Sequence, residues 1–332
     1  MQIRGVLINA DGDHLGGSLA NLEGCLALFR SAGFDGVEIS AHGLDVISGG
    51  RLRRAQVDRV RAILERYPFR YTVHGADQTN FAFPGTTIGG TDSSMDRAVF
   101  VADLDFCAEI HAPVMVYHSG LISLYPAATG LGALPDDEEL ARAREREAAA
   151  LRELAPLAAE RGVVVAMENR DPHPWEIAVL RHFGLPPEKL PKYHAGMMVP
   201  DLVAQVKAVG HPNVGLTLDL GHLYLAANQC GFDFLEAVRQ AAPYARHVHA
   251  SDNWGRLGGP FDSLNHRIPH GEGDVHMPPG WGGIPHVEAL RQMPQYEGYY
   301  LVEIRPRFYE HAAEARQTAQ RLVAEATDGR GP

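Results

Sequence analysis

The stretch VGLTLDLGH, residues 214–222, decides the fold class, because it has the pattern of a buried strand that turns directly into a helix. Its Val and Leu residues alternate with Gly, Thr and Asp, as the two faces of a strand require. Seven other short apolar runs are spread along the chain, and polar loops and amphipathic helical patterns separate them. The eight predicted strands are residues 3–9, 36–40, 69–75, 112–120, 163–169, 214–220, 245–251 and 299–304.

Between these strands, apolar residues recur at spacings of three and four, which is typical of helices packed on a sheet. Strands that alternate with helices form a parallel sheet, and eight of them close a barrel. No GxGxxG turn follows the first strand, which disfavours an open dinucleotide-binding sheet. We therefore predict a single-domain (β/α)₈ barrel over residues 1–332, with long loops at 172–200 and 253–285 after strands five and seven. Clear helical patterns cover residues 18–33, 50–67, 96–110, 137–162 and 232–243.

The composition narrows the class of partner. The 41 acidic residues against 30 basic ones give a net charge of -11, which disfavours nucleic acid. No apolar stretch is long enough to span a bilayer or to form a signal peptide. The scattered Cys25, Cys107 and Cys230 are typical of free thiols in a reducing compartment. These features predict a cytoplasmic protein that acts on a small molecule, and they leave a homo-oligomer open.

Each of the last four predicted strands carries a metal-ligating side chain near its end: Glu168, Asp219, His249 and Glu303. Neighbouring strands lie about 4.8 Å apart, so inward side chains at one rim of the barrel converge. Three buried carboxylates would repel one another, and a divalent cation removes that repulsion. This oxygen-rich set with one imidazole predicts one divalent metal ion, with Mn, Mg or Co best suited and Zn allowed.

A second set of polar side chains lies at the same rim. Two histidines end strands three and four, a third follows Asp219 by three residues, and an Asp-x-His lies in the loop after strand seven. The histidines could bind substrate hydroxyls, or the whole set could hold additional metal ions. The residues are His74, His118, His222, Asp274 and His276.

The order of these motifs resembles the xylose isomerase-like barrel superfamily, which includes sugar phosphate isomerases and epimerases, ketose 3-epimerases, inosose dehydratases and type IV apurinic endonucleases. The resemblance covers essentially the whole chain. It implies that Glu168 and Glu303, besides binding the metal, exchange a proton with the substrate carbon, and that His222 contacts a substrate hydroxyl. The implied activity is isomerisation or epimerisation of a sugar or polyol through a metal-bound enediolate. The motifs are MEN (167–169), LDLGH (218–222), HVHASDN (247–253), HGEGD (270–274) and LVEI (301–304).

The type IV endonucleases use three zinc ions, and the resemblance extends to their additional ligands at His74, His118 and Asp274–His276. A second alignment of the glycines in HGEGD leaves Asn265 and Arg267 at the positions of an Asp and a His. Both alignments stay open, and so does the number of metal ions.

The substrate contacts are predicted more coarsely. Ketose 3-epimerases place an Arg shortly after the strand-seven His, whereas here Gly255 holds that position and Arg256 comes next. The substrate therefore need not be a free ketohexose. We assign Arg256, Trp254 in the long loop and Glu38 at the end of strand two to the substrate.

Two other classes of function remain as alternatives. One is a metal-dependent lyase or hydrolase on the same scaffold, similar to inosose dehydratases, to enzymes that open carbon-linked glycosides, or to type IV endonucleases. The other is a non-catalytic ligand-binding barrel, which the intact pair of glutamates disfavours.

Overall fold

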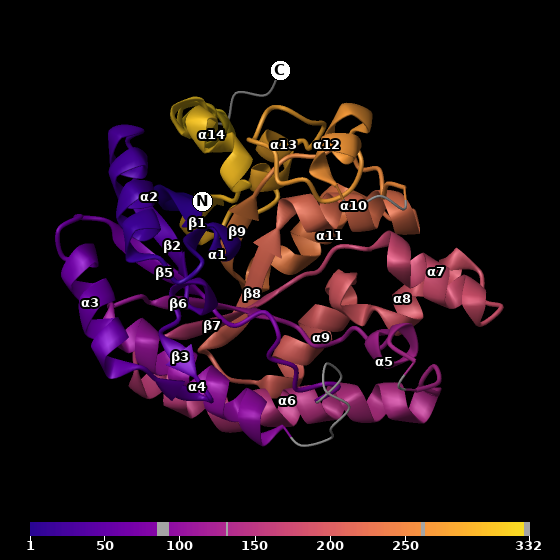
Figure 1. Cartoon of the computed structure of the whole chain (residues 1–332). Helices are drawn as coiled ribbons and strands as arrows, with labels where there is room; N and C mark the ends of the chain where they lie inside the picture. The colour runs from indigo at the N-terminus through magenta and orange to yellow at the C-terminus, as the bar shows by residue number, and fades with distance from the viewer. Residues whose placement is uncertain (85–92, 131, 260–262, 329–332) are drawn as a thin grey trace.

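Eight parallel strands close into the predicted barrel in the computed structural model, which describes residues 1–84, 93–130, 132–259 and 263–328 (Figure 1). The order around the barrel is β1-β10-β9-β8-β7-β6-β5-β2, so the first and last strands pair and close it. All eight predicted strands form, within a few residues of their expected bounds. They are β1 (Gln2–Ala10), β2 (Gly36–Ser40), β5 (Arg70–His74), β6 (Val114–His118), β7 (Val164–Glu168), β8 (Val214–Asp219), β9 (Ala245–Ala250) and β10 (Glu297–Val302).

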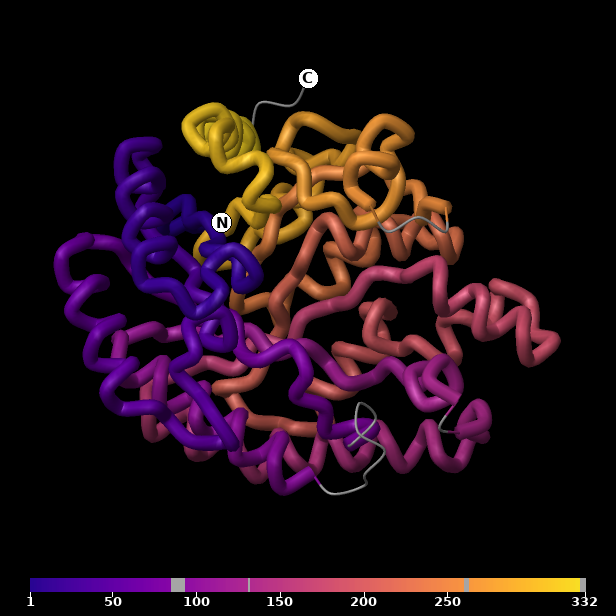
Figure 2. The backbone as a smooth tube through the Cα atoms, in the orientation of Figure 1, coloured from indigo at the N-terminus to yellow at the C-terminus, as the bar shows by residue number. Residues whose placement is uncertain are grey.

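Helices surround the strands and bury their apolar sides (Figures 1 and 2). Figure 2 shows the indigo start of the chain beside the yellow α14, which agrees with the contacts of α14 with β1 and α2. The helices are α1 (Gly12–Leu15), α2 (Leu19–Ser31), α3 (Arg54–Leu64), α4 (Ser94–Glu109), α5 (Tyr125–Ala128), α6 (Asp137–Glu160), α7 (Pro174–His182), α8 (Leu190–Tyr193), α9 (Val199–Val209), α10 (Leu220–Cys230), α11 (Phe234–Ala241), α12 (Leu264–Arg267), α13 (His286–Arg291) and α14 (Ala312–Thr327). Short 3₁₀ segments are η1 (His42–Leu44), η2 (Pro187–Lys189), η3 (Ala195–Met197), η4 (Ala242–Tyr244), η5 (Ile268–His270) and η6 (Pro306–His311).

One predicted helix starts later than its sequence pattern indicated. Residues 50–67 were expected to be helical, but α3 begins at Arg54. The residues before it form a two-stranded antiparallel hairpin of β3 (Ile47–Ser48) and β4 (Arg51–Leu52). Gly49 and Gly50 connect the two strands with φ of 57° and 71°, a left-handed conformation that glycine adopts without steric cost.

The long loops after β7 and β9 contain short helices. The first, predicted at 172–200, holds α7 and α8, and the second, at 253–285, holds α12. Part of the second loop, residues 260–262, lies outside the described residues. Among the described residues, no helix is both long and apolar enough to cross a membrane.

Candidate metal centre

The four predicted ligands meet at the carboxyl ends of β7 to β10. Their ligand atoms all lie within 4.8 Å of one another. The His249 Nδ1 atom is 2.9 Å from Glu168 Oε1 and 3.0 Å from Glu303 Oε2. It is 3.9 Å from Asp219 Oδ2. These separations suit donor atoms that share one ion.

Local structure fixes the Asp219 carboxylate at this point. Asp219 ends β8 and caps α10, where its Oδ1 accepts a hydrogen bond of 2.6 Å from the His222 backbone N–H. The side chain of Asn169 holds the same residue from β7, accepting from its N–H at 2.8 Å and donating to its carbonyl at 3.0 Å. Only Asp219 Oδ2 is left to face the centre.

His249 is oriented by a carboxylate on the far side of its ring. Its Nε2 atom lies 3.1 Å from Glu38 Oε1, so Nδ1 is presented to the three other carboxylates. Glu38 also accepts from Thr72 Oγ1 at 2.9 Å and lies 3.1 Å from His247 Nε2. Glu38 is 1% exposed; its Oε2 atom interacts with Thr72 and His247, whereas its Oε1 atom lies near His249 without a hydrogen bond. It therefore supports His249, and because it also lines the cavity at the mouth of the barrel, its role as a substrate contact stays a prediction.

The charges of this cluster favour a cation. Burial, together with the charges of Glu303 and Glu168, raises the pKa of Asp219 to about 7. Burial opposes ionisation of Glu303 as well, but the imidazolium of His249 lowers the pKa of that carboxyl to about 2. One oxygen of each carboxylate is buried without a hydrogen bond among the described residues: Glu168 Oε2, Asp219 Oδ2 and Glu303 Oε2. A divalent ion satisfies all three at once, so the residues present fit the predicted metal.

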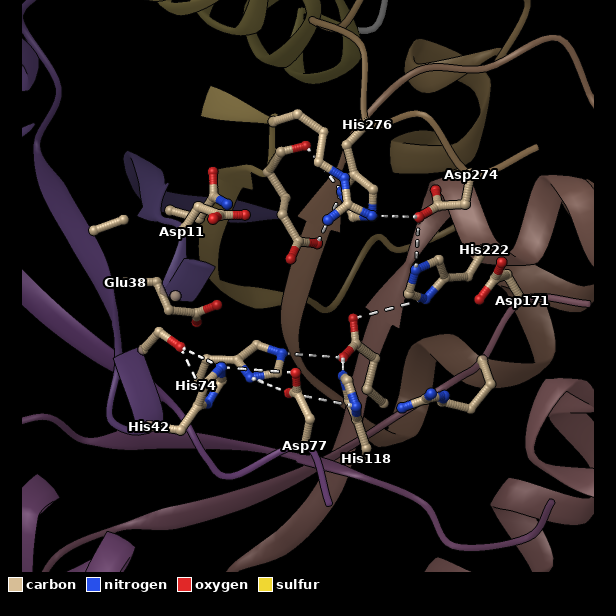
Figure 3. A pocket seen from close by; sticks show the side chains of 18 of the residues that line it. Asp11, Glu38, His42, His74, Asp77, His118, Asp171, His222, Asp274 and His276 are labelled. Atoms are coloured by element: carbon tan, nitrogen blue, oxygen red, sulfur yellow. Dashed lines mark hydrogen bonds and ion pairs between the residues drawn. The ribbon is translucent and has the colours of Figure 1, made fainter. Parts of the chain in front are cut away.

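Two additional triads of side chains that could hold a metal lie beside this cluster. Figure 3 shows His74 and His118 of the first triad and His222, Asp274 and His276 of the second. On one side, the Nε2 atoms of His74 and His118 lie 3.6 and 2.8 Å from Glu168 Oε2. On the other side, His222 Nε2 lies 3.7 Å from Asp274 Oδ2, which also pairs with His276. The structure thus brings the whole second set of predicted residues together.

Asp77 is a site residue that the sequence analysis missed. Its Oδ1 atom lies 3.3 Å from His74 Nδ1 and 3.6 Å from His118 Nδ1, so both rings turn Nε2 toward Glu168. His74 and Asp77 also group with His42. The available signal was the position of Asp77, three residues after a strand-ending His.

The second set of predicted residues, together with Glu168 and Glu303, lines a cavity of about 230 Å³ at the mouth of the barrel. Its wall includes other polar residues that the sequence analysis did not single out. Arg170 follows Glu168 by two residues, and its charge adds to burial in lowering the pKa of His118 to about 4. These wall residues are Asp11, His42, Asp77, Arg170, Asp171 and Arg305.

Two predicted substrate contacts do not reach this cavity. Trp254 is 52% exposed and packs against Gly271, and Arg256 donates a hydrogen bond to the His270 carbonyl on the outer surface. The chain turns outward here because Asn253 accepts from the Gly255 N–H, at φ 67°. Neither residue lines the cavity, so the structure gives no support to the prediction that Trp254 and Arg256 contact the substrate.

The comparisons with known proteins agree with this fold. The chain belongs to the xylose isomerase-like TIM barrel family, whose model matches residues 26–325. Over 120 residues it is 28% identical to an uncharacterized protein of Methanocaldococcus jannaschii, and the alignment spans 35% of each chain.

Several solved structures share the fold. A D-tagatose 3-epimerase-like protein matches with a TM-score of 0.65 at 18% identity, covering 97% of this chain and 98% of the other. The IOLI protein with a bound zinc atom matches with a TM-score of 0.61 at 19% identity, covering 98% of this chain and 98% of the other. A 3-keto-D-glucoside 4-epimerase from E. coli matches with a TM-score of 0.60 at 17% identity, covering 96% of this chain and 98% of the other.

Proposed function

We propose that this protein is a divalent-metal-dependent isomerase or epimerase of a sugar or polyol. The observation that carries the proposal is the arrangement of Glu168 and Glu303, which approach the His249 Nδ1 atom from two strand ends at 2.9 and 3.0 Å. Family membership supports it, as do structural neighbours whose names describe sugar epimerases.

Glu168, Asp219, His249 and Glu303 would hold the ion, which when bound polarises adjacent substrate oxygens and acidifies the C–H bond between them. Glu168 and Glu303 then act as the acid/base pair, one removing the carbon-bound proton and the other returning one. Burial opposes ionisation of both carboxyls, but the nearby charge of His249 lowers the pKa of each below its usual range. His222 is oriented by its Nδ1 atom, 2.9 Å from the Asn169 carbonyl, and offers Nε2 to a substrate hydroxyl.

The first test is hydrogen exchange in deuterated water. We expect the wild-type protein to exchange one carbon-bound hydrogen of a ketose or inosose, and Glu303→Gln to lower the rate by at least about 10²-fold, because general acid–base catalysis contributes that much. The glutamine keeps an oxygen for the metal, so metal content is measured alongside. Trp254→Ala, on the exposed outer loop, is the control. Normal exchange by a metal-loaded Glu303→Gln variant would remove the acid/base assignment.

A second candidate function is metal-dependent hydrolysis or elimination with up to three ions. The two flanking triads, His74–His118–Glu168 and His222–Asp274–His276, favour it, because several adjacent dications can stabilise an in-line displacement at phosphorus. The net charge of -11 weighs against a nucleic acid substrate.

Metal stoichiometry separates the two candidates. Proton transfer requires one ion per chain at saturation, whereas the hydrolytic candidate requires three. In the second case His276→Ala should lose one equivalent, and the wild-type protein should cleave bis(p-nitrophenyl) phosphate. One ion per chain, without phosphodiester cleavage, would exclude the three-metal hydrolase.

A further inference from the structure

We propose that an anion-binding subsite built on Arg170 adjoins the metal centre and takes the carboxylate or phosphate group of an acidic sugar or polyol. The proposal rests on the proposed function and narrows its substrate class, because neither the family match nor the neighbours specify a charged substrate.

Arg170 lies between two adjoining cavities. It lines the metal-centre cavity and also a second one of about 230 Å³, and Asp77 and His118 line both as well. The second cavity is walled mainly by polar residues of the loops after β5 and β6, together with Tyr125 of α5. A substrate bound to the metal centre at one end can therefore extend past Arg170 into this space.

The backbone holds Arg170 in place. Its N–H donates to the Gly196 carbonyl at 3.0 Å, and a Cβ atom at position 196 would lie 3.3 Å from the Arg170 Cγ atom. The glycine therefore leaves room for the arginine stem to lie against η3. This contact positions the side chain but provides no acceptor for its charged guanidinium group.

The Arg170 guanidinium has no counter-charge in contact. Among the residues described by the structure, it makes no ion pair and no hydrogen bond, and its Nε atom is buried without a partner. The nearby carboxylates already pair with imidazoles: Asp77 Oδ1 lies 3.3 Å from His74 Nδ1, and Asp171 Oδ2 lies 3.7 Å from His173 Nε2. A guanidinium is always charged, so a partly buried one without a partner is stabilised by an oxyanion that it can bind through two N–H groups.

Thr79 supplies an independent observation in the second cavity. Thr79 is 5% exposed, and its Oγ1 atom is also buried without a hydrogen-bond partner. It lines the second cavity with Arg170, so a buried hydroxyl and a guanidinium there both lack an acceptor. Two unsatisfied donors in one small polar cavity indicate a ligand that carries several acceptor oxygens.

The test compares three probes with the same six-carbon chain: glucitol, gluconate and glucitol 6-phosphate. Calorimetric titration of the metal-loaded wild-type protein should give dissociation constants about tenfold or more lower for at least one acidic probe than for glucitol. The stronger of the two acidic probes identifies the carboxylate or the phosphate as the natural group. Equal affinity for all three would overturn the proposal.

Variants assign the preference to this subsite rather than to the metal. Arg170→Gln should abolish the preference for the acidic probe and leave the glucitol affinity unchanged, Arg170→Lys should keep part of it, and Thr79→Val should weaken it. Arg51→Gln, an exposed arginine outside both cavities, is the control. An acidic preference that survives in Arg170→Gln would place the anion on the metal and overturn the subsite. Failure of the wild-type protein to bind metal would instead count against the proposed function, which keeps the two failures distinguishable.

Discussion

Each histidine around the centre presents one ring nitrogen inward, and a carboxylate or carbonyl oxygen lies within 3.6 Å of the other. This pairing fixes ring orientation before any ligand binds, and it makes the inner nitrogen a better donor to a cation. These oxygens are Glu38 Oε1 for His249, the Asn169 carbonyl for His222, the Gly75 carbonyl and Asp77 for His74, Asp77 for His118, and the Glu303 carbonyl for His276.

The role of Glu38 gives a prediction at this scale. Glu38→Gln should weaken divalent metal binding about 10- to 100-fold, the usual cost of losing such a carboxylate behind a ligating histidine. Competition with a chromogenic chelator measures the affinity. Thr72→Val is a matched control, because it removes a donor to Glu38 and leaves the contact with His249 intact. Unchanged metal affinity in Glu38→Gln would show that His249 is oriented without it.

The proposed metal ligands were predicted from the sequence, whereas the side chains that orient them were not. Glu168, Asp219 and His249 lie at or near strand ends, and strand periodicity alone aims them at one rim. Glu38 meets His249 across the barrel, a relation that no local pattern encodes, whereas the only local signal for Asp77 is its position three residues after His74. The exposed position of Trp254 depends on a turn at Gly255, which the sequence pattern did not predict.

At the scale of elements, the strand that carries His118 is held by a carboxylate of the neighbouring helix α6. Glu147 is fully buried and accepts from the Gly120 N–H at 2.6 Å, Tyr117 Oη at 3.0 Å and Gln205 Nε2 at 2.8 Å. Burial raises the pKa of Glu147, because these donors only partly replace water. The helix thus fixes the backbone on both sides of a site histidine.

Glu147→Ala should therefore lower the free energy of unfolding by about 3 kcal/mol, because it leaves several buried donors unsatisfied. Urea denaturation measures the loss. Glu145→Ala on the same helix is the matched control: that carboxylate is 70% exposed, 3.7 Å from Arg152, and its removal should cost less than about 1 kcal/mol. Equal effects of the two substitutions would contradict a supporting role for Glu147.

The elements themselves followed closely from the sequence, and the exceptions have a physical cause. Long helices and apolar strands repeat a period several times, so the pattern survives local irregularity. The hairpin of β3 and β4 has two residues per strand and no alternation to detect, and only the pair Gly49–Gly50 signals its turn. The short α7, α8 and α12 are likewise set by contacts within long loops.

On the scale of the whole molecule, the barrel was predictable because eight strands that alternate with helices have few closed arrangements. Closure joins residues far apart in the chain: β1 pairs with β10, and Glu303, one residue beyond β10, reaches the same point as Glu168 from β7. The centre therefore connects the ends of four neighbouring strands, and without a cation its buried carboxylates repel each other.

Metal binding should for this reason stabilise the folded molecule as a whole. A ligand that binds only the folded state adds about 4 kcal/mol to the free energy of unfolding at 1,000 times its dissociation constant. The midpoint of thermal unfolding should thus rise by several degrees on adding Mn²⁺ or Zn²⁺ and fall on adding a chelator, as measured by calorimetry. His249→Ala, which removes the atom that faces three carboxylates, should abolish the shift, whereas Trp254→Ala should retain it. If the chelator-treated protein unfolds at the same temperature as the metal-loaded one, the four strand ends do not share an ion. That result would contradict the proposed metal-dependent mechanism.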